Sequence, residues 1–217
     1  KPLRVAPVAH FSGGGAQIDA YGATTEPGFY AAGEAAGGMH GANRMGGNAL
    51  TECLVFGHRA GKAAFDFAVS RAKGAEAKGV CKPLEIGEPH ENPDVLREEL
   101  SRVMWMHGGI RRDARGLAAG LERVRAIGLA AARTRGVNEP RRLEKYLETQ
   151  LAATAAELIL EAATRREESR GTHARTDFPE SDDAHWRGHL RVALGVGGAN
   201  WWFDPVFDDD GELKVTA

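Results

Sequence analysis

The sequence predicts a mainly helical α+β chain with three successive parts. Its first third holds short apolar runs bounded by glycines, which are typical of strands and tight turns. Its middle holds three stretches in which apolar residues recur at helical spacing, and its end shows neither pattern. The predicted parts are α/β material at 1–73, a linker at 74–92, a helical bundle at 93–170 and an irregular C-terminal tail at 171–217.

The α/β part is expected to contain strands at 3–11 and 16–22, and a turn followed by a third strand at 26–34. A helix follows, which Asn48 can cap and in which Glu52 lies in the first turn, where a carboxylate interacts favourably with the helix dipole. One helix face is expected to comprise Leu50, Leu54, Ala60 and Ala64. If the chain is a fragment, its strands would lack neighbours, and their exposed edges would favour a homo-oligomer formed through exposed strands.

The helical bundle is predicted from helix signals and apolar stripes. Its first helix begins with Asn92 as cap and Pro93 at the first helical position, and it ends at Gly108 and Gly109. Two more helices are expected from about 113 to 133 and from about 141 to 165. Three amphipathic helices of this length can form a bundle. The residues predicted to face its core are Leu96, Leu100, Val103, Met104, Leu117, Leu121, Val124, Leu129, Leu143, Leu147, Leu151, Leu158 and Ile159.

The tail after the bundle lacks a clear period. Its last stretch, "GGANWWFDPVFDDDGELKV", is compatible with an extended arm or with a small hairpin that turns at "DDDGE". Trp201 and Trp202 indicate a contact surface, because aromatic residues are enriched at interfaces.

Composition excludes several classes of function. The formal net charge is −2, which supplies no cationic field for general nucleic-acid binding. No apolar run approaches the roughly 20 residues that a membrane span needs, and no signal peptide is visible. Cys53 and Cys81 lie far apart without metal-ligand spacing, so we expect no metal site and a reduced, cytoplasmic setting. Because Lys1 is not an initiator residue, the chain is expected to be a fragment or a processed product.

A candidate binding site lies in the glycine-rich region before the first helix. The loop "MGGN" leads into a helix that starts near Ala49, and unpaired N–H groups at a helix start bind anions. Arg44 just precedes it and carries a guanidinium suited to a carboxylate. Glu34 can accept hydrogen bonds from hydroxyl groups, and His10 and His40 can bind an oxyanion or move protons. The alternative is that these glycines only form turns.

Four motifs follow one another in the order of a known family: "PVAHFSGGG", "GFYAAGEAAGGMHGANRMGGNALTECLVFG", "MWMHGGIRRDARGL" and "REESRGTHARTDFPESDD". The chain resembles, to about residue 187, the C-terminal part of the flavoprotein subunit of succinate dehydrogenase and fumarate reductase, a family that includes L-aspartate oxidase. The resemblance implies the C-terminal portion of a split FAD-binding α/β domain, followed by a helical domain and a tail. The dinucleotide fingerprint and the substrate-capping domain would lie in missing upstream sequence.

The resemblance also implies roles for individual residues. His10 matches a substrate-binding histidine and Arg44 the arginine that binds a substrate carboxylate, so both are candidate catalytic residues. Glu34 matches an acidic residue that bonds the flavin ribityl chain. Ala49 and Leu50 match positions whose N–H groups face the flavin ring. His40 is expected to contact substrate or flavin, and Asn48 to be a cap and a flavin neighbour.

The implied chemistry is hydride exchange between FAD and a dicarboxylate, with an iron–sulfur subunit as electron partner. Location would then be cytoplasmic, or peripheral on the cytoplasmic membrane face through partner subunits. "GGNALTE" is more like the fumarate reductase branch than the aspartate oxidases. The chain departs from the family at Gly13, where methionine is common, which suggests a looser loop. The alternatives are an L-aspartate oxidase-like or other soluble flavin dehydrogenase, and a non-catalytic helical interaction fragment; the isolated chain is expected to be inactive.

One other cluster could be mistaken for a catalytic site. His173, Arg175 and Asp177 combine a histidine, a cation and a carboxylate within five residues. We favour a structural role, in which they anchor the helical domain to the flavin domain or to an adjacent subunit.

Overall fold

The computed structural model describes residues 10–72, 91–133 and 140–206, and the chain folds as two compact units. The first unit comprises Lys1–Gly79 together with Arg187–Ala217, and the second comprises Val80–Trp186. The predicted strand at 3–11 and the predicted linker at 74–92 lie almost wholly outside the described residues.

The first unit has far less sheet than the sequence predicted. Strand β1 (Ala16–Gln17) pairs in parallel with β2 (Ala36–Gly37), and a single turn of 3₁₀ helix, η1 (Gly33–Ala35), precedes β2. The backbones approach so closely here that a Cβ on Gly15 would come within 2.4 Å of the Ala35 carbonyl oxygen. Glycine is therefore required at this pairing.

The strand predicted at 16–22 ends early because Asp19 supplies local hydrogen bonds. Its side chain accepts from the N–H groups of Tyr21 and Ala23, at 2.8 and 2.9 Å. These bonds satisfy the backbone within a turn and replace a sheet ladder. The segment predicted as a strand at 26–34 contributes only one antiparallel bridge, between Ala23 and Tyr30.

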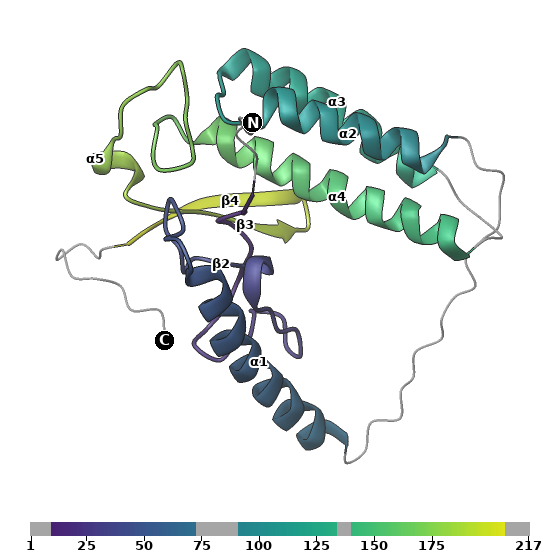
Figure 1. The fold of residues 1–217 in the computed structure, drawn as a ribbon, viewed down its shortest axis with the longest axis vertical. Helices are drawn as coiled ribbons and strands as arrows, with labels where there is room; N and C mark the ends of the chain where they lie inside the picture. The colour runs from purple at the N-terminus through teal and green to yellow at the C-terminus, as the bar shows by residue number, and fades with distance from the viewer. Residues whose placement is uncertain (1–9, 73–90, 134–139, 207–217) are drawn as a thin grey trace, which may run out of the picture. The chain divides into compact units, whose positions relative to one another are not determined.

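Helix α1 (Asn48–Ala72) begins one residue before the predicted start, so that Asn48 lies inside the helix (Figure 1). Its face differs from the prediction. Ala60 is buried, and a Cβ on Gly22 would lie 2.6 Å from the Ala60 Cβ, so the preceding loop packs closely there. Leu50 and Leu54 are each 75% exposed instead of buried.

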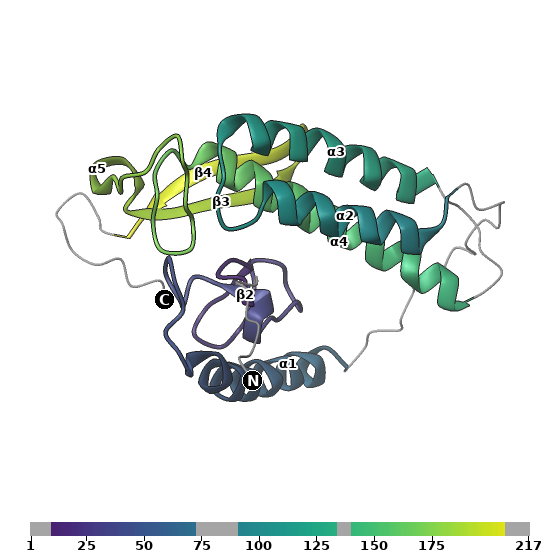
Figure 2. The same ribbon diagram turned by 45° about the horizontal axis from the view of Figure 1, so that its top comes forward.

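The second unit is the predicted three-helix bundle. Helices α2 (Pro93–His107), α3 (Ala114–Arg133) and α4 (Pro140–Arg165) lie side by side (Figures 1 and 2). Asn92 caps α2 as predicted, since its side chain accepts from the Asp94 N–H at 3.0 Å, and Gly108 ends the helix. A Cβ on Gly120 would lie 2.7 Å from the His107 Cβ, so glycine lets α3 approach the end of α2.

The core-facing residues of α2 and α3 agree with the prediction more closely than those of α4. Leu96, Leu100, Val103, Leu117 and Val124 are buried, Met104 and Leu121 pack against them, and Leu129 is exposed. On α4 the predicted face is wrong: Leu147, Leu151 and Ile159 are exposed. The buried face of α4 comprises Tyr146, Thr149, Ala153, Ala156, Leu160 and Ala163. Small alanines allow the helices to pack closely, so the alanine face makes the contact.

The tail is more regular than predicted. After a short helix, α5 (Asp183–Trp186), strands β3 (Gly188–Gly195) and β4 (Gly198–Pro205) pair in an antiparallel hairpin that belongs to the first unit. Gly195 pairs with Gly198, so the turn lies at 196–197, and the predicted turn at "DDDGE" falls outside the described residues. An ion pair of 2.6 Å between Arg191 and Asp204 bridges the two strands.

Candidate functional site

Two of the residues proposed for binding come together in the loops that lead into α1. Arg44 and His40 meet on the ring of Phe11. The Arg44 guanidinium carbon lies 4.6 Å from the centre of the Phe11 ring, and the His40 ring meets the same ring edge-on at 5.3 Å and 77°. Residues 11, 40 and 44 are thus neighbours in space although 33 positions separate the first from the last.

Two buried nitrogen atoms of this cluster have no hydrogen-bond partner among the described residues: Nε2 of His40 and Nε of Arg44. Among the described residues, the Arg44 side chain donates a hydrogen bond from Nη1 to the carbonyl of Met45, at 3.1 Å. Buried polar groups normally have partners, and leaving one unpaired is costly. The arrangement therefore leaves donor capacity for a polar, anionic ligand.

Glu34 is exposed and ties two loops together. Its Oε1 accepts from the Ser12 N–H at 2.8 Å, which fixes the backbone beside Phe11. A carboxylate has further acceptor sites, so Glu34 can also accept from ligand hydroxyl groups.

Glu52 holds the turn that carries Glu34. The carboxylate is 6% exposed, and its Oε1 accepts from the Gly33 N–H at 2.8 Å. Gly33 has φ +70°, a conformation that favours glycine, and this conformation lets the N–H meet the helix. The prediction that Glu52 lies in the first turn of the helix was wrong, because the first turn of α1 holds no acidic residue. Glu52 instead accepts from the Gly33 N–H, a contact that no local pattern could have shown.

The other predicted residues flank this cluster in the sequence. His10 is exposed and adjoins Phe11 in sequence. Asn48 and Leu50 are exposed at the start of α1, and Ala49 is half-buried. The first N–H groups of a helix have no partner within it, so those of Ala49 and Leu50 are available to an acceptor. Phe11 was not among the predicted residues, although an aromatic residue directly after His10 was a usable signal.

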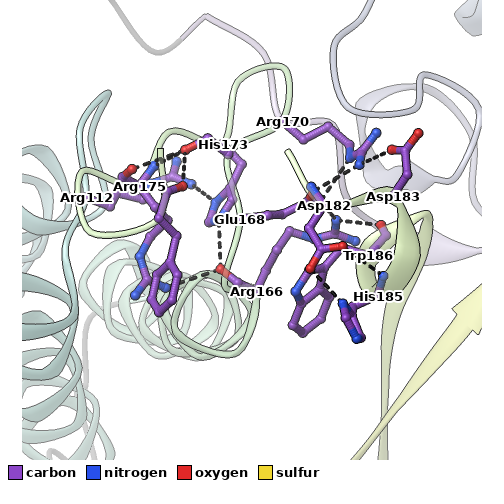
Figure 3. A network of polar contacts seen from close by, with 12 residues as sticks. Arg112, Arg166, Glu168, Arg170, His173, Arg175, Asp182, Asp183, His185 and Trp186 are labelled. Atoms are coloured by element: carbon purple, nitrogen blue, oxygen red, sulfur yellow. Dashed lines mark hydrogen bonds and ion pairs between the residues drawn. The ribbon is translucent and has the colours of Figure 1, made fainter. Parts of the chain in front are cut away.

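The second cluster, predicted to be structural, binds together the ends of the bundle (Figure 3). Arg175 is 3% exposed and donates from Nη1 to the carbonyls of Ala163, Thr164 and Arg166, at 2.8 to 3.2 Å. These groups lie at the C-terminal end of α4, where carbonyls lack helical partners. Arg175 also donates two bonds to Asp177, whose carboxylate accepts from the Ala114 N–H at the start of α3. The pair thus anchors the segment within the helical unit.

The charges of this cluster shift the pKa values of its members. Hydrogen bonding from Arg175 holds the pKa of Asp177 far below its usual range. Burial favours a raised pKa for the Glu168 carboxyl, but the hydrogen bonds from Arg170, the Asp182 N–H and Arg166 outweigh it and lower that pKa. Glu168 is fully buried. The cluster is therefore a network of ion pairs around a buried carboxylate.

His173 in this network is neutral and fixed in one tautomer. Its Nδ1 lies 2.9 Å from Nη1 of Arg112, which can only donate, and its Nε2 lies 3.1 Å from the carbonyl oxygen of Arg166, which can only accept. The proton therefore resides on Nε2. Burial lowers the pKa of His173 below its ordinary value of 6.5, and the charges of Arg112, Arg166 and Arg175 lower it further.

We expect the bundle to lose stability in mild acid through His173. A lowered folded-state pKa means that the unfolded chain binds more protons below about pH 6.5, so the stabilisation is complete above that pH and is lost as the pH falls towards the folded pKa. The loss is at most about 1.4 kcal/mol per pH unit. Urea unfolding between pH 7.5 and 5 should show a steeper decline for the wild type than for His173→Gln. Parallel curves would show that His173 does not titrate in this window.

Comparisons with known proteins agree with the motifs. Residues 1–50 match the family described as "FAD binding domain", and residues 97–200 match that described as "Fumarate reductase flavoprotein C-term". The chain is 39% identical over 208 residues to a fumarate reductase flavoprotein subunit of Mycobacterium tuberculosis, with 87% of this chain and 36% of the relative covered. It is 36% identical over 204 residues to an L-aspartate oxidase of Streptomyces coelicolor, with 89% of this chain and 34% of the relative covered.

Among solved structures, the fold is similar to FrdA of E. coli quinol fumarate reductase, with a TM-score of 0.81, 26% identity and coverage of 100% of this chain and 39% of that one. These matches define a flavoprotein. The chain belongs to the family of the flavoprotein subunits of succinate dehydrogenase and fumarate reductase. It spans about a third of the length of the curated relatives that it matches.

Two further findings concern the described ranges alone. No helix within them is both long and apolar enough to cross a bilayer. No group of three or more His, Cys, Asp or Glu side chains within them is arranged to hold a metal ion.

Proposed function

We propose that this chain is the C-terminal part of an FAD-dependent oxidoreductase that interconverts succinate and fumarate. The observation that carries the proposal is the pair of buried nitrogen atoms, Arg44 Nε and His40 Nε2, that have no partner among the described residues. They lie beside a helix start and near an exposed carboxylate. This donor set suits a ligand that combines an acid with a polyol chain. The flavoprotein that contains this sequence is called the parent below.

The residues of this chain fit FAD as the cofactor of the parent. Glu34 keeps acceptor capacity for ribityl hydroxyl groups beyond the bond from Ser12. The N–H groups of Ala49 and Leu50 begin a 25-residue helix, where the dipole stabilises negative charge. Bound FAD supplies the hydride exchange with the C2–C3 bond of the substrate.

In this proposal the protein's own groups bind and polarise the substrate. Arg44 binds one carboxylate through its planar fork of donors, and His10 and His40 contact the same substrate. A cation on that carboxylate stabilises the negative charge that develops on it during reduction of the adjacent double bond. The Met45 carbonyl and the Phe11 ring hold the guanidinium without a carboxylate partner among the described contacts, so its charge remains available.

The electron partner is also a proposal. We propose that a subunit carrying iron–sulfur clusters exchanges electrons with the flavin of the parent. The similarity to a quinol fumarate reductase supports this. The first described unit could also associate with a second copy, but β1 and β2 are two residues long and offer only short edges.

L-aspartate oxidase activity is the second candidate, favoured by the 36% identity to such an enzyme. One experiment on the parent distinguishes the two. Chemically reduced parent is mixed anaerobically with fumarate, and oxidised parent is mixed aerobically with L-aspartate. We expect fumarate to reoxidise the flavin and to yield succinate, and we expect no hydrogen peroxide from aspartate. Peroxide formation without reoxidation by fumarate would establish the oxidase instead.

The third candidate, a non-catalytic helical fragment, applies to the isolated chain and not to the parent. A purified chain without the flavin absorbance band would show that the isolated chain does not retain FAD. Such a result leaves the proposal for the parent to be decided by the fumarate experiment.

A further inference from the structure

The Phe11 ring contacts both Arg44 and His40. The guanidinium carbon of Arg44 lies 4.6 Å from its centre, and the His40 ring meets it edge-on at 5.3 Å. Phe11 is half-buried, and so are Arg44 and His40. Its position therefore affects the two side chains whose buried nitrogen atoms lack described partners.

An aromatic ring can hold a guanidinium group without using its N–H donors or neutralising its charge, whereas a carboxylate cannot. The attraction acts on the face of the planar group, so the N–H donors along its edge are not consumed. A carboxylate partner would occupy two of those donors and neutralise the charge. Only one donor of Arg44, on Nη1, is used by the described protein, in its bond to the Met45 carbonyl. The ring thus orients the group and keeps it cationic.

The backbone that carries Phe11 is itself fixed by a short relay of contacts. Glu52 on α1 accepts from the Gly33 N–H, and the next residue, Glu34, accepts from the Ser12 N–H, each at 2.8 Å. Ser12 directly follows Phe11. Two hydrogen bonds therefore link the first part of α1 to the backbone that carries Phe11.

We propose that Phe11 is the positioning residue that holds the Arg44 guanidinium, and with it the His40 ring, in the orientation that binds a substrate carboxylate. The inference rests on the proposed function, in which Arg44 contacts the substrate. It assigns to Phe11 an effect on substrate affinity that acts through Arg44.

The test uses the FAD-loaded parent and malonate, a dicarboxylate that cannot be reduced, whose binding is followed by the change in flavin absorbance. Phe11→Met keeps the volume and apolar character but removes the π face, whereas Phe11→Tyr keeps it. We expect F11M to weaken malonate binding by about 5- to 30-fold, the range that a desolvated cation–π contact supports. We expect F11Y to stay within about twofold of the wild type, and both variants to keep full flavin content. Phe67→Leu is the matched control, because the Arg71 guanidinium carbon lies 5.0 Å from the centre of the Phe67 ring, near the other end of α1. This replacement should leave malonate binding unchanged.

Arg44→Leu, measured in parallel, separates the two proposals. Malonate affinity lost in R44L but unchanged in F11M overturns the role of Phe11 and leaves the proposed function standing. Malonate affinity unchanged in R44L overturns the proposed function and the inference together. Combined with R44L, F11M should lower kcat/KM for fumarate by less than about twofold more, because the contact is already absent. A further full-sized loss in the double variant would overturn the inference, since Phe11 would then act independently of Arg44.

Discussion

Replacing Glu168 with glutamine is expected to lower the free energy of unfolding by about 3–5 kcal/mol, the usual cost of removing one partner of a buried ion pair. The Glu168 side chain is fully buried, and it accepts from Arg166, from two nitrogen atoms of Arg170 at 2.9 Å and from the Asp182 N–H at 2.8 Å. Glutamine has the same shape but no charge and one acceptor oxygen fewer. Two guanidinium groups would then lack their shared counterion.

The measurement is urea unfolding followed by helical circular dichroism at pH 7. Glu167→Gln is the matched control, because Glu167 is the adjacent residue and is exposed. Exposed charge changes of this kind usually alter stability by at most about 0.5 kcal/mol. Equal, small losses in both variants would show that the network in Figure 3 does not stabilise the bundle.

Replacing Arg44 with leucine is expected to lower kcat/KM for fumarate in the parent by at least about 100-fold. The estimate follows the loss of 10²–10³-fold that removal of one donor to a developing anion typically causes. The flavin should remain bound, because the proposed flavin contacts belong to Glu34 and to the N–H groups of Ala49 and Leu50. The assay is anaerobic reduction of fumarate, with flavin content measured by absorbance.

Arg59→Leu is the control for this variant. Arg59 also lies over an aromatic ring of the first unit, that of Phe56 at 5.5 Å, and donates to the Ala20 carbonyl at 3.3 Å. It has no proposed role in substrate binding, so its replacement should change kcat/KM by less than about threefold, within the effect of an ordinary surface substitution. A similar loss in both variants would indicate a general disturbance of the unit.

The bundle could be predicted from sequence where helix signals and periodicity agree. Asn92, Pro93 and Gly108 define the ends of α2 by local chemistry, and its stripe of Leu96, Leu100 and Val103 is buried as predicted. Helix α4 shows where periodicity is insufficient. It has both an alanine face and a leucine stripe, and pattern alone does not reveal which face the neighbouring helices contact. Alanine packs there because it allows close approach, although a leucine buries more area per residue.

The candidate site could be predicted in part. Arg44, His40 and Glu34 were identified from residue type and resemblance, and the structure brings them into one region of the first unit. The contact of the Phe11 ring with Arg44 and the contact of Glu52 with Gly33 could not be derived, because they join segments that only the folded loops bring together. The prediction of a strand over 16–22 was wrong because of local contacts. The apolar pattern favoured a strand, but the Asp19 side chain accepts from nearby backbone N–H groups and so replaces the hydrogen bonds of a sheet.

The most direct test of the central claim is a crystal structure of the parent with FAD and malonate bound. The account predicts that the Arg44 guanidinium donates to a malonate carboxylate at about 2.7–2.9 Å, the usual length of a charge-assisted hydrogen bond. It also predicts His10 or His40 beside the same ligand, and the start of α1 directed at the flavin ring. Arg44 and both histidines directed away from malonate would contradict the proposed site.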